Sequence, residues 1–208
     1  MWVVKVGGSL FGGKSLPGWL AALTRHGRGR VVIVPGGGPF ADQVRAAQAR
    51  WRFGDAVAHR MAMLGMAQYG LMLRGLEPAL VAASGEEAIR LAWRRRKVPI
   101  WTPCGASIPD VRADWSMTSD ALAAWLAARL RIEHLLLVKS VRIDAARIAA
   151  DELARRGVVD LRLPELLREA RLTCRILAAQ DYDLFQAALR GEPAGAAVTA
   201  ALSGTAGD

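Results

Sequence analysis

The chain has 208 residues, of which 52% are hydrophobic and 23% are charged, so it can bury a sizeable core and is not intrinsically disordered. Its net charge of +9 favours anionic partners such as nucleotides, phosphorylated metabolites or nucleic acid. The apolar stretch over 61–83 is interrupted by polar residues and by Pro78, and it falls short of a membrane span. We therefore expect no membrane partner.

Most of the positive charge is scattered, because single arginines stand among alanines and leucines along the expected helices. One dense cluster, Arg94–Lys97, falls where a helix should end and complements the helix dipole there. This distribution favours a small phosphorylated partner and no nucleic acid. The two cysteines, Cys104 and Cys174, lack the spacing of a metal site, and without a signal peptide they indicate a cytoplasmic protein.

The first predicted element is a short buried strand, Val3–Val6, which contains a lysine, Lys5. Because side chains alternate along a strand, Lys5 points to the opposite face from Val4 and Val6. Lysine is almost never buried without a partner, and glycines let an anion approach the backbone closely. The pattern favours a phosphate site, with a structural ion pair as the alternative. Gly7, Gly8 and Ser9 follow the strand, and a helix is expected over 16–24.

A second buried strand, Val31–Val34, also ends in glycines, and short apolar strands then alternate with helices along the chain. Continuous apolar strands of this kind are typical of a mostly parallel sheet covered by helices on both faces. Ligands of such sheets bind beyond the carboxyl ends of the strands, where the glycines lie. Further strands are expected over 79–82, 98–101, 135–138 and 174–177, and further helices over 41–51, 53–73, 85–95, 118–130, 166–170 and 182–189.

One alternative phosphate-binding motif lies within the first loop. Residues 8–15 read GSLFGGKS, which satisfies the P-loop pattern G-x-x-x-x-G-K-S with Lys14 as its lysine. Pro17 and Gly18 fall where the first helical turns of a P-loop would be. The best candidate for a magnesium-binding aspartate, Asp160 after an apolar pair, is weak. A P-loop also leaves Lys5 unexplained, so it is kept as an alternative only.

Four segments together resemble the amino acid kinase superfamily, which includes acetylglutamate, carbamate, uridylate and isopentenyl phosphate kinases. They are VVKVGGSL at 3–10, VVIVPGGGPF at 31–40, TSDALAAWLAARL at 118–130 and LLLVKS at 135–140. Within the superfamily the chain is most similar to the kinases of methanofuran biosynthesis, which act on an aminomethylfuran-methyl phosphate, and to their methylotroph relatives. The resemblance implies a single amino acid kinase domain over 1–208, a three-layer αβα sandwich with a mainly parallel sheet of about eight strands.

The resemblance also implies catalytic roles for Lys5, Asp120 and Lys139. Lys5 would bridge the transferring phosphoryl group, whereas Asp120 would orient lysines, because a carboxylate beside a phosphate would repel it. Helix capping is the alternative for Asp120. Lys139 is the candidate for the second positive charge that many members bring from later in the chain. The implied phosphate-binding residues are Gly7, Gly8, Ser9, Gly36, Gly37 and Gly38, and the nucleotide-binding residues are Thr118, Ser119 and Ser140.

Three residues are candidates for binding the acceptor. Asp42 could receive a substrate ammonium group, Arg45 could bind an anion, and His59 could bond the acceptor phosphate or be a satisfied buried histidine. The methionines at 61, 63, 66 and 72 are expected to serve helix packing or a subunit contact rather than a ligand site.

We therefore expect an enzyme, a phosphotransferase that moves the γ-phosphoryl group of ATP with Mg²⁺ to a small phosphomonoester. An acceptor-binding lobe is expected over about 1–105 and a nucleotide-binding lobe over about 106–208. No cluster of metal ligands is evident, so Mg²⁺ should arrive with the nucleotide. Two alternatives stay open, a P-loop nucleotidase and a non-catalytic binding protein, the latter because Arg142 and Ile143 stand where relatives carry Asp-Gly. Seven tryptophans and the apolar segment over 61–73 predict a homodimer.

Overall fold

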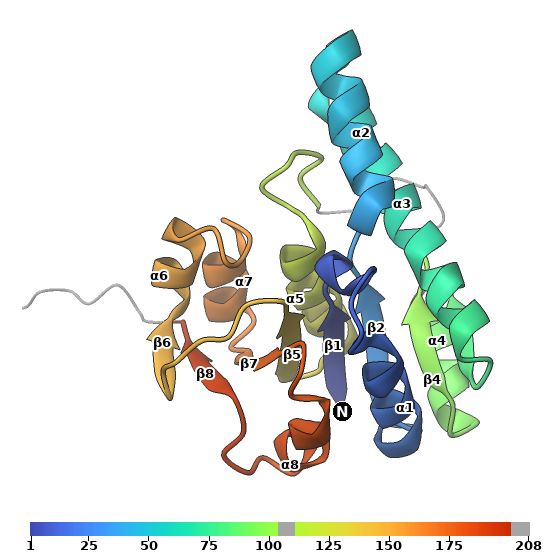
Figure 1. Ribbon diagram of the computed structural model, residues 1–208, viewed down its shortest axis with the longest axis vertical. Coiled ribbons are helices and arrows are strands. Elements are labelled where there is room, and N and C mark those ends of the chain that lie inside the picture. Colours follow the sequence, from blue (N-terminus) through green and yellow to red (C-terminus); the bar gives the residue numbers. More distant parts are fainter. Residues whose placement is uncertain (104–110, 201–208) are drawn as a thin grey trace, which may run out of the picture.

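The computed structural model of the chain describes residues 1–103 and 111–200, so Cys104 lies outside the described residues. Its centre is one eight-stranded sheet in the order β3-β4-β2-β1-β5-β7-β8-β6 (Figure 1). Neighbouring strands pair in parallel except β7 and β8, which are antiparallel. The strands are β1 (Trp2–Val6), β2 (Val31–Pro35), β3 (Leu80–Ala83), β4 (Val98–Trp101), β5 (His134–Lys139), β6 (Arg147–Ala149), β7 (Thr173–Ala178) and β8 (Ala196–Thr199).

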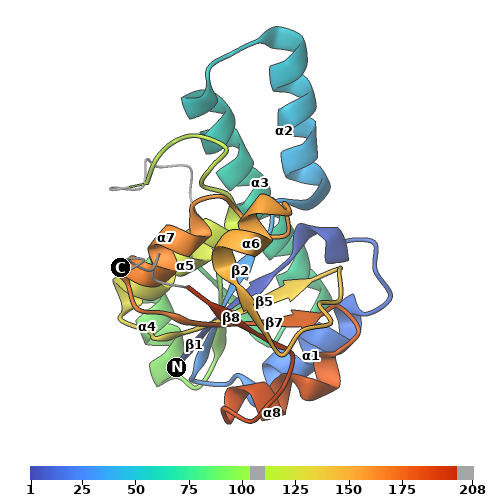
Figure 2. The ribbon, with the colours of Figure 1, turned by 90° about the vertical axis from the view of Figure 1, so that its left-hand side faces the viewer.

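Helices cover both faces of this sheet, which gives the predicted three-layer αβα sandwich (Figure 2). Their bounds are α1 (Leu16–His26), α2 (Gly38–Trp51), α3 (Asp55–Leu76), α4 (Glu86–Arg94), α5 (Ser119–Leu130), α6 (Ala150–Arg155), α7 (Leu163–Glu169) and α8 (Phe185–Leu189). Among these helices, none combines the length and the apolar character that crossing a bilayer requires.

The core has two halves, because successive strand residues face opposite sides of the sheet. Val3 and Leu137 pack with apolar residues of α4, α5, α6 and α7, whereas Val4 and Leu136 pack with residues of α1, α3 and α8. Lys5 alternates with Val4 as predicted and lies on the α5 side of the sheet. The lysine is therefore embedded in an apolar wall, where only a nearby carboxylate can compensate its charge.

The helices α2 and α3 form a long hairpin that projects beyond the carboxyl end of β2, as both ribbon views show (Figures 1 and 2). The outer side of α3 carries exposed apolar residues at spacings of four, three and seven, namely Val57, Met61, Leu64 and Leu71, with exposed fractions of 53, 36, 43 and 52%. Met63 and Met66, on the inner side, are buried. The methionines of this segment thus divide between core and surface.

The sequence pattern predicted six of the eight strands and missed β6, β8 and α6. These elements are short, and β8 reads Ala-Ala-Val-Thr, which lacks the continuous apolar run of the central strands. Asp160, the weak candidate for the magnesium-binding aspartate of a P-loop, lies in the irregular segment between α6 and α7 and not at the end of a strand. The predicted helix over 166–170 begins earlier, at Leu163.

Candidate active site

Two glycine-rich loops lie against each other at the carboxyl ends of β1 and β2. A Cβ atom on Gly8 would lie 2.3 Å from the backbone nitrogen of Gly38, and one on Gly36 would lie 2.3 Å from that of Gly8. Gly38 also has a φ of 52°, a left-handed conformation that favours glycine. Because α2 begins at Gly38, its first N–H groups lack intrahelical acceptors and are available to an anion.

Three buried charges from β1, α5 and β5 meet beside these loops. The Lys5 Nζ lies 2.9 Å from one carboxylate oxygen of Asp120, and the Lys139 ammonium group donates to the other oxygen. The exposed fractions of the three side chains are 7% for Lys5, 2% for Asp120 and 13% for Lys139. With two cations and one anion, the cluster keeps one positive charge, which suits it to a phosphate.

The pKa values in this cluster reflect both burial and ion pairing. Burial alone would raise the pKa of Asp120, but the ammonium groups of Lys5 and Lys139 hold it below its usual range. The pKa of Lys139 is lowered by burial and by Lys5, and the Asp120 carboxylate offsets part of this effect. Asp120 therefore stays ionised between the two lysines and fixes their positions.

Asp160 caps the helix that carries Asp120, although it lies 40 residues further along the chain. One of its carboxylate oxygens accepts hydrogen bonds from the backbone N–H groups of Asp120 and Ala121, both at 3.0 Å. The other oxygen accepts from the hydroxyl of Thr118. Burial and the Asp120 charge raise the pKa of Asp160. The helix-capping alternative for Asp120 is thus wrong, because Thr118 occupies the N-cap position without a side-chain cap hydrogen bond and Asp160 supplies the acceptor instead.

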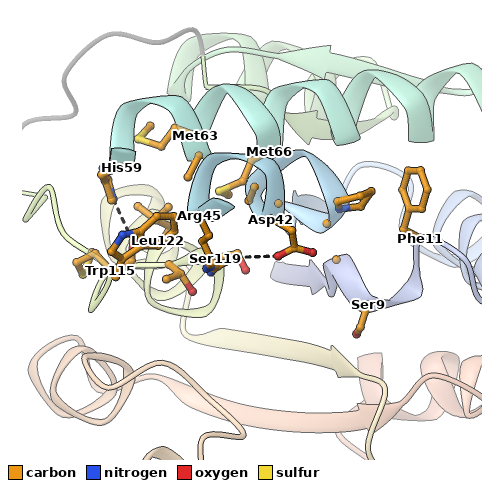
Figure 3. A pocket seen from close by; sticks show the side chains of 18 residues that line it. Ser9, Phe11, Asp42, Arg45, His59, Met63, Met66, Trp115, Ser119 and Leu122 are labelled. Atoms are coloured by element: carbon orange, nitrogen blue, oxygen red, sulfur yellow. Dashed lines mark hydrogen bonds and ion pairs between the residues drawn. The ribbon is translucent and has the colours of Figure 1, made fainter. Parts of the chain in front are cut away.

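A cavity of about 400 Å³ opens between the first loop, the α2–α3 hairpin and the start of α5 (Figure 3). The predicted residues Gly8, Ser9, Gly37 and Gly38 form its floor on the loop side, while Lys5, Asp120 and Lys139 are not part of its lining. Its apolar wall is formed by Phe11, Ala62, Met63, Met66, Met117 and Leu122. Met63 and Met66, which were expected to serve helix packing or a subunit contact rather than a ligand site, line this cavity.

Asp42 and Arg45 both line the cavity, and they pair with each other at 3.0 Å (Figure 3). The Arg45 guanidinium carbon also lies 4.5 Å from the ring centre of Trp115. Trp115 is held in turn, because its indole N–H donates to Gln48 Oε1 at 2.7 Å. Arg45 is therefore oriented by a carboxylate and an aromatic ring, with half of its side chain exposed toward the cavity and solvent.

His59 occupies the wall opposite the first loop and is buried. Its Nε2 lies 3.0 Å from the carbonyl oxygen of Met117, so this nitrogen carries the proton and donates. His59 is thus a buried histidine that is satisfied at Nε2 and also lines the cavity, while its contact with an acceptor phosphate stays a prediction.

The predicted nucleotide-binding residues do not gather in one place. Thr118 and Ser119 line the cavity beside the first loop, whereas Ser140 follows β5 and is exposed. The Arg142 side chain reaches Asp181 after β7, at 2.6 Å. The P-loop lysine, Lys14, is exposed on the turn before α1, away from the buried charges.

Sequence reasoning missed the structural roles of Asp160 and Trp115. Asp160 sits in a short turn segment without periodicity, and its partners are 39 to 42 residues away, so no local pattern signals the contact. Trp115 lies four residues before the first residue of α5, and an aromatic residue near the start of that helix was the one available signal.

Comparisons with known proteins agree with this geometry. Residues 1–142 match the model of the amino acid kinase family. A [5-(aminomethyl)furan-3-yl]methyl phosphate kinase of Methanocaldococcus jannaschii is 25% identical over 144 residues, which span 68% of this chain and 66% of that protein.

Solved structures of uridylate kinases share the fold. That of Archaeoglobus fulgidus superposes with a TM-score of 0.74 at 14% identity, over 95% of this chain and 99% of that one. The UMP kinase of Bacillus anthracis gives 0.69 at 15% identity, over 97 and 96%. With the family match over 1–142, the predicted fold and the predicted resemblance are both confirmed, and the chain belongs to the amino acid kinase family.

Proposed function

We propose that this protein transfers the γ-phosphoryl group of ATP to a small phosphomonoester and releases a diphosphate. The observation that carries the proposal is the buried Lys5–Asp120–Lys139 cluster beside two glycine loops. Phosphoryl transfer needs little covalent chemistry from a protein, but it needs aligned oxygens and neutralised charge. A fixed surplus of one positive charge next to open backbone N–H groups supplies both.

In this mechanism Lys5 contacts the phosphoryl group during its transfer, and Lys139 neutralises negative charge on the phosphates of the donor nucleotide. The N–H groups at Gly8, Gly37 and Gly38 hold the oxygens of donor and acceptor in line. Asp120 is a positioning residue, since it touches the two ammonium groups rather than the phosphates. Mg²⁺ would accompany the nucleotide and neutralise its β- and γ-phosphates.

The cavity defines the kind of acceptor that we propose. Its volume of about 400 Å³ suits a small molecule. The acceptor phosphate would bind at Gly8 and Gly38, and an apolar or aromatic body would rest on Met63, Met66 and Leu122. Asp42 would receive a cationic substituent. An aminomethylfuran-methyl phosphate, the substrate type named for the relative, has these three parts, and we propose an acceptor of this class.

The two expected lobes fit this assignment. The cavity is built by residues 8–122, mostly from the first lobe, about 1–105, which would bind the acceptor. The second lobe, about 106–208, contributes β5 to β8 and would bind ATP near Lys139 and Ser140. Arg142 lies in this half, where its exposed guanidinium could contact the nucleotide phosphates.

The test is product formation from MgATP and a panel of phosphomonoesters, with and without a cationic group. We expect ADP and a diphosphate product, with the highest kcat/KM for a ring-bearing aminomethyl phosphate. Thermal unfolding gives an independent check, because MgATP at 100 times its Kd should add about 2.7 kcal/mol of stability. If no nucleotide shifts the melting curve, the non-catalytic binding protein becomes the better interpretation.

We also propose a homodimer, with the exposed stripe of α3 as the contact. Its apolar residues Val57, Met61, Leu64 and Leu71 follow one another at spacings of four, three and seven, which keeps them on one face of the helix, so two copies of this helix could pack along one line. Light scattering at micromolar concentration should give twice the chain mass of 22.4 kDa. Leu64→Lys should return the monomer, and a monomeric wild-type protein would contradict the proposal.

A further inference from the structure

A second group of cations lies at the opposite end of the sheet from the glycine loops. Arg30 directly precedes β2 and Lys97 directly precedes β4, whereas the glycine loops follow the opposite ends of β1 and β2. The five residues of β2 separate the two ends by about 17 Å at 3.3 Å per residue. A ligand bound here would therefore not touch the catalytic cluster.

These cations surround two adjoining depressions. One, of about 290 Å³, is lined by Thr24, Arg28, Arg95, Arg96 and Lys97 together with two apolar residues. The other, of about 440 Å³, is lined by Arg25, His26, Arg28, Arg30 and Arg96. Arg28 and Arg96 belong to both, so the two depressions form one continuous basic site. Neither lining contains an acidic side chain.

Helix capping explains only part of this charge. The carboxyl ends of α1 and α4 both lie here, and each carries roughly half a negative charge. Arg28 Nε donates to the Thr24 carbonyl at 3.2 Å, and Arg30 Nε donates to the His26 carbonyl at 2.8 Å. Within residues 1–103 and 111–200, no ion pair joins a carboxylate to the arginines or the lysine of this site. About one negative charge from two helix ends thus faces six cations.

The pKa of His26, which lines the second depression, reflects the positive potential of the site. Burial and the guanidinium groups of Arg25 and Arg30, with Arg190 nearby, lower the pKa of this imidazole. A bound anion would offset the repulsion between these guanidinium groups and a protonated His26, so the pKa of His26 would rise. His26 is one of only three histidines in the chain, so its signals can be assigned readily.

We propose that this basic site binds a small polyphosphate anion, such as the di- or triphosphate group of a metabolite. Arginine guanidinium groups pair with phosphate oxygens through two parallel hydrogen bonds, and five of the six cations are arginines. The cations converge on a depression rather than follow a strip. No Trp, Tyr or Phe side chain lines either depression, so the site lacks the stacking surface that single-stranded nucleic acid uses.

The test follows the His26 ring resonances by NMR during titration with sodium tripolyphosphate at constant ionic strength. We expect a saturable change and a higher His26 pKa in the bound state. Arg28→Gln combined with Arg96→Gln should weaken binding by at least about tenfold, since it removes both shared guanidinium groups. Arg50→Gln combined with Arg147→Gln is the matched control, because it removes one exposed charge at the tip of the α2–α3 hairpin and one on β6, and it should leave the affinity within about twofold.

Three outcomes would overturn the proposal. His26 could stay unperturbed at millimolar tripolyphosphate, or both double variants could weaken binding equally, which would indicate unspecific charge attraction. A single-stranded oligonucleotide could also displace tripolyphosphate at a lower phosphate concentration, which would make the surface a nucleic-acid site. Circular dichroism of each variant separates loss of binding from loss of folding.

Discussion

Cations gather at both ends of the sheet, but the two groups differ in burial and in their contacts with carboxylates. At the carboxyl end, Lys5 and Lys139 are buried and share the carboxylate of Asp120. At the amino end, Arg95 and Lys97 are exposed and have no carboxylate beside them in the lining of their depression. A buried charge needs a fixed partner, whereas an exposed one is solvated by water. Single substitutions should therefore be costly at the first end and nearly silent at the second.

The largest effect on stability is expected for Asp120→Asn. The substitution leaves two ammonium groups facing each other in a buried site, and removing one partner of such a pair costs about 3–5 kcal/mol. Urea unfolding at neutral pH measures this loss. The exposed Asp42→Asn is the matched control, because its partner Arg45 is also exposed, and it should cost less than about 1 kcal/mol.

The stabilities of the wild-type protein and Asp120→Asn can also be compared as a function of pH. The pKa of Asp120 is lower in the folded than in the unfolded state, so its contribution to stability is complete above the unfolded-state value of about 3.9. It is lost as the pH falls through the lower folded-state pKa. The stability difference between wild type and Asp120→Asn should therefore shrink in acid, and a difference that is constant with pH would contradict the ion pairing.

Measurements of turnover should distinguish the role of Lys5 from that of Lys14. If Lys5 contacts the phosphoryl group in the transition state, Lys5→Ala should lower kcat by a few hundred-fold, or about 3–4 kcal/mol, with a smaller change in KM. Lys14→Ala removes an exposed lysine and should change turnover by no more than a few-fold. The reverse order, with Lys5→Ala folded and active, would support the P-loop interpretation instead. Circular dichroism is the folding control for both variants.

A moderate effect is expected at Asp160, whose role is structural support of the same cluster. Asp160→Ala removes the acceptor for two backbone N–H groups at the start of α5, a loss that costs about 1–2 kcal/mol at helix ends. It should also lower kcat, because Asp120 sits in that first turn, and Asp160→Asn should recover part of both losses. Asp151→Ala, an exposed aspartate paired with Arg168, is the control, and it should cost below about 0.5 kcal/mol.

Much of the site at the carboxyl ends of the strands could be predicted, because the sequence patterns that indicate it are local. A lysine inside an apolar strand and glycines directly after two strands are visible in short windows, and parallel topology then brings the strand ends together. The family resemblance implied that Asp120 orients lysines, Lys5 among them, and the structure places the Asp120 carboxylate between Lys5 and Lys139. The catalytic roles of these residues stay predictions.

The remaining features depend on contacts between distant segments. Asp160 could not be recognised as the cap of α5, because the helix start offered Thr118 and Ser119 as better local candidates. The strands β6 and β8 are only three and four residues long and pair with each other at the sheet edge, where apolar runs are not needed. The amino-end site appears in the sequence as two distant groups of cations, one over 25–30 and the dense cluster Arg94–Lys97, and only the turns before β2 and β4 bring them together.

The smallest effect is expected at that basic end. Arg95→Gln combined with Lys97→Gln removes two exposed cations from a crowded positive site, so the free energy of unfolding should change by no more than about 0.5 kcal/mol. At low salt the double substitution should increase the free energy of unfolding, because it removes repulsion between like charges. This stabilisation should vanish near 0.15 M salt, where the Debye length is about 8 Å. Urea unfolding at two ionic strengths measures it. A loss above about 1 kcal/mol at either salt concentration would show that these cations hold the fold together, and the contrast between the two ends of the sheet would then fail.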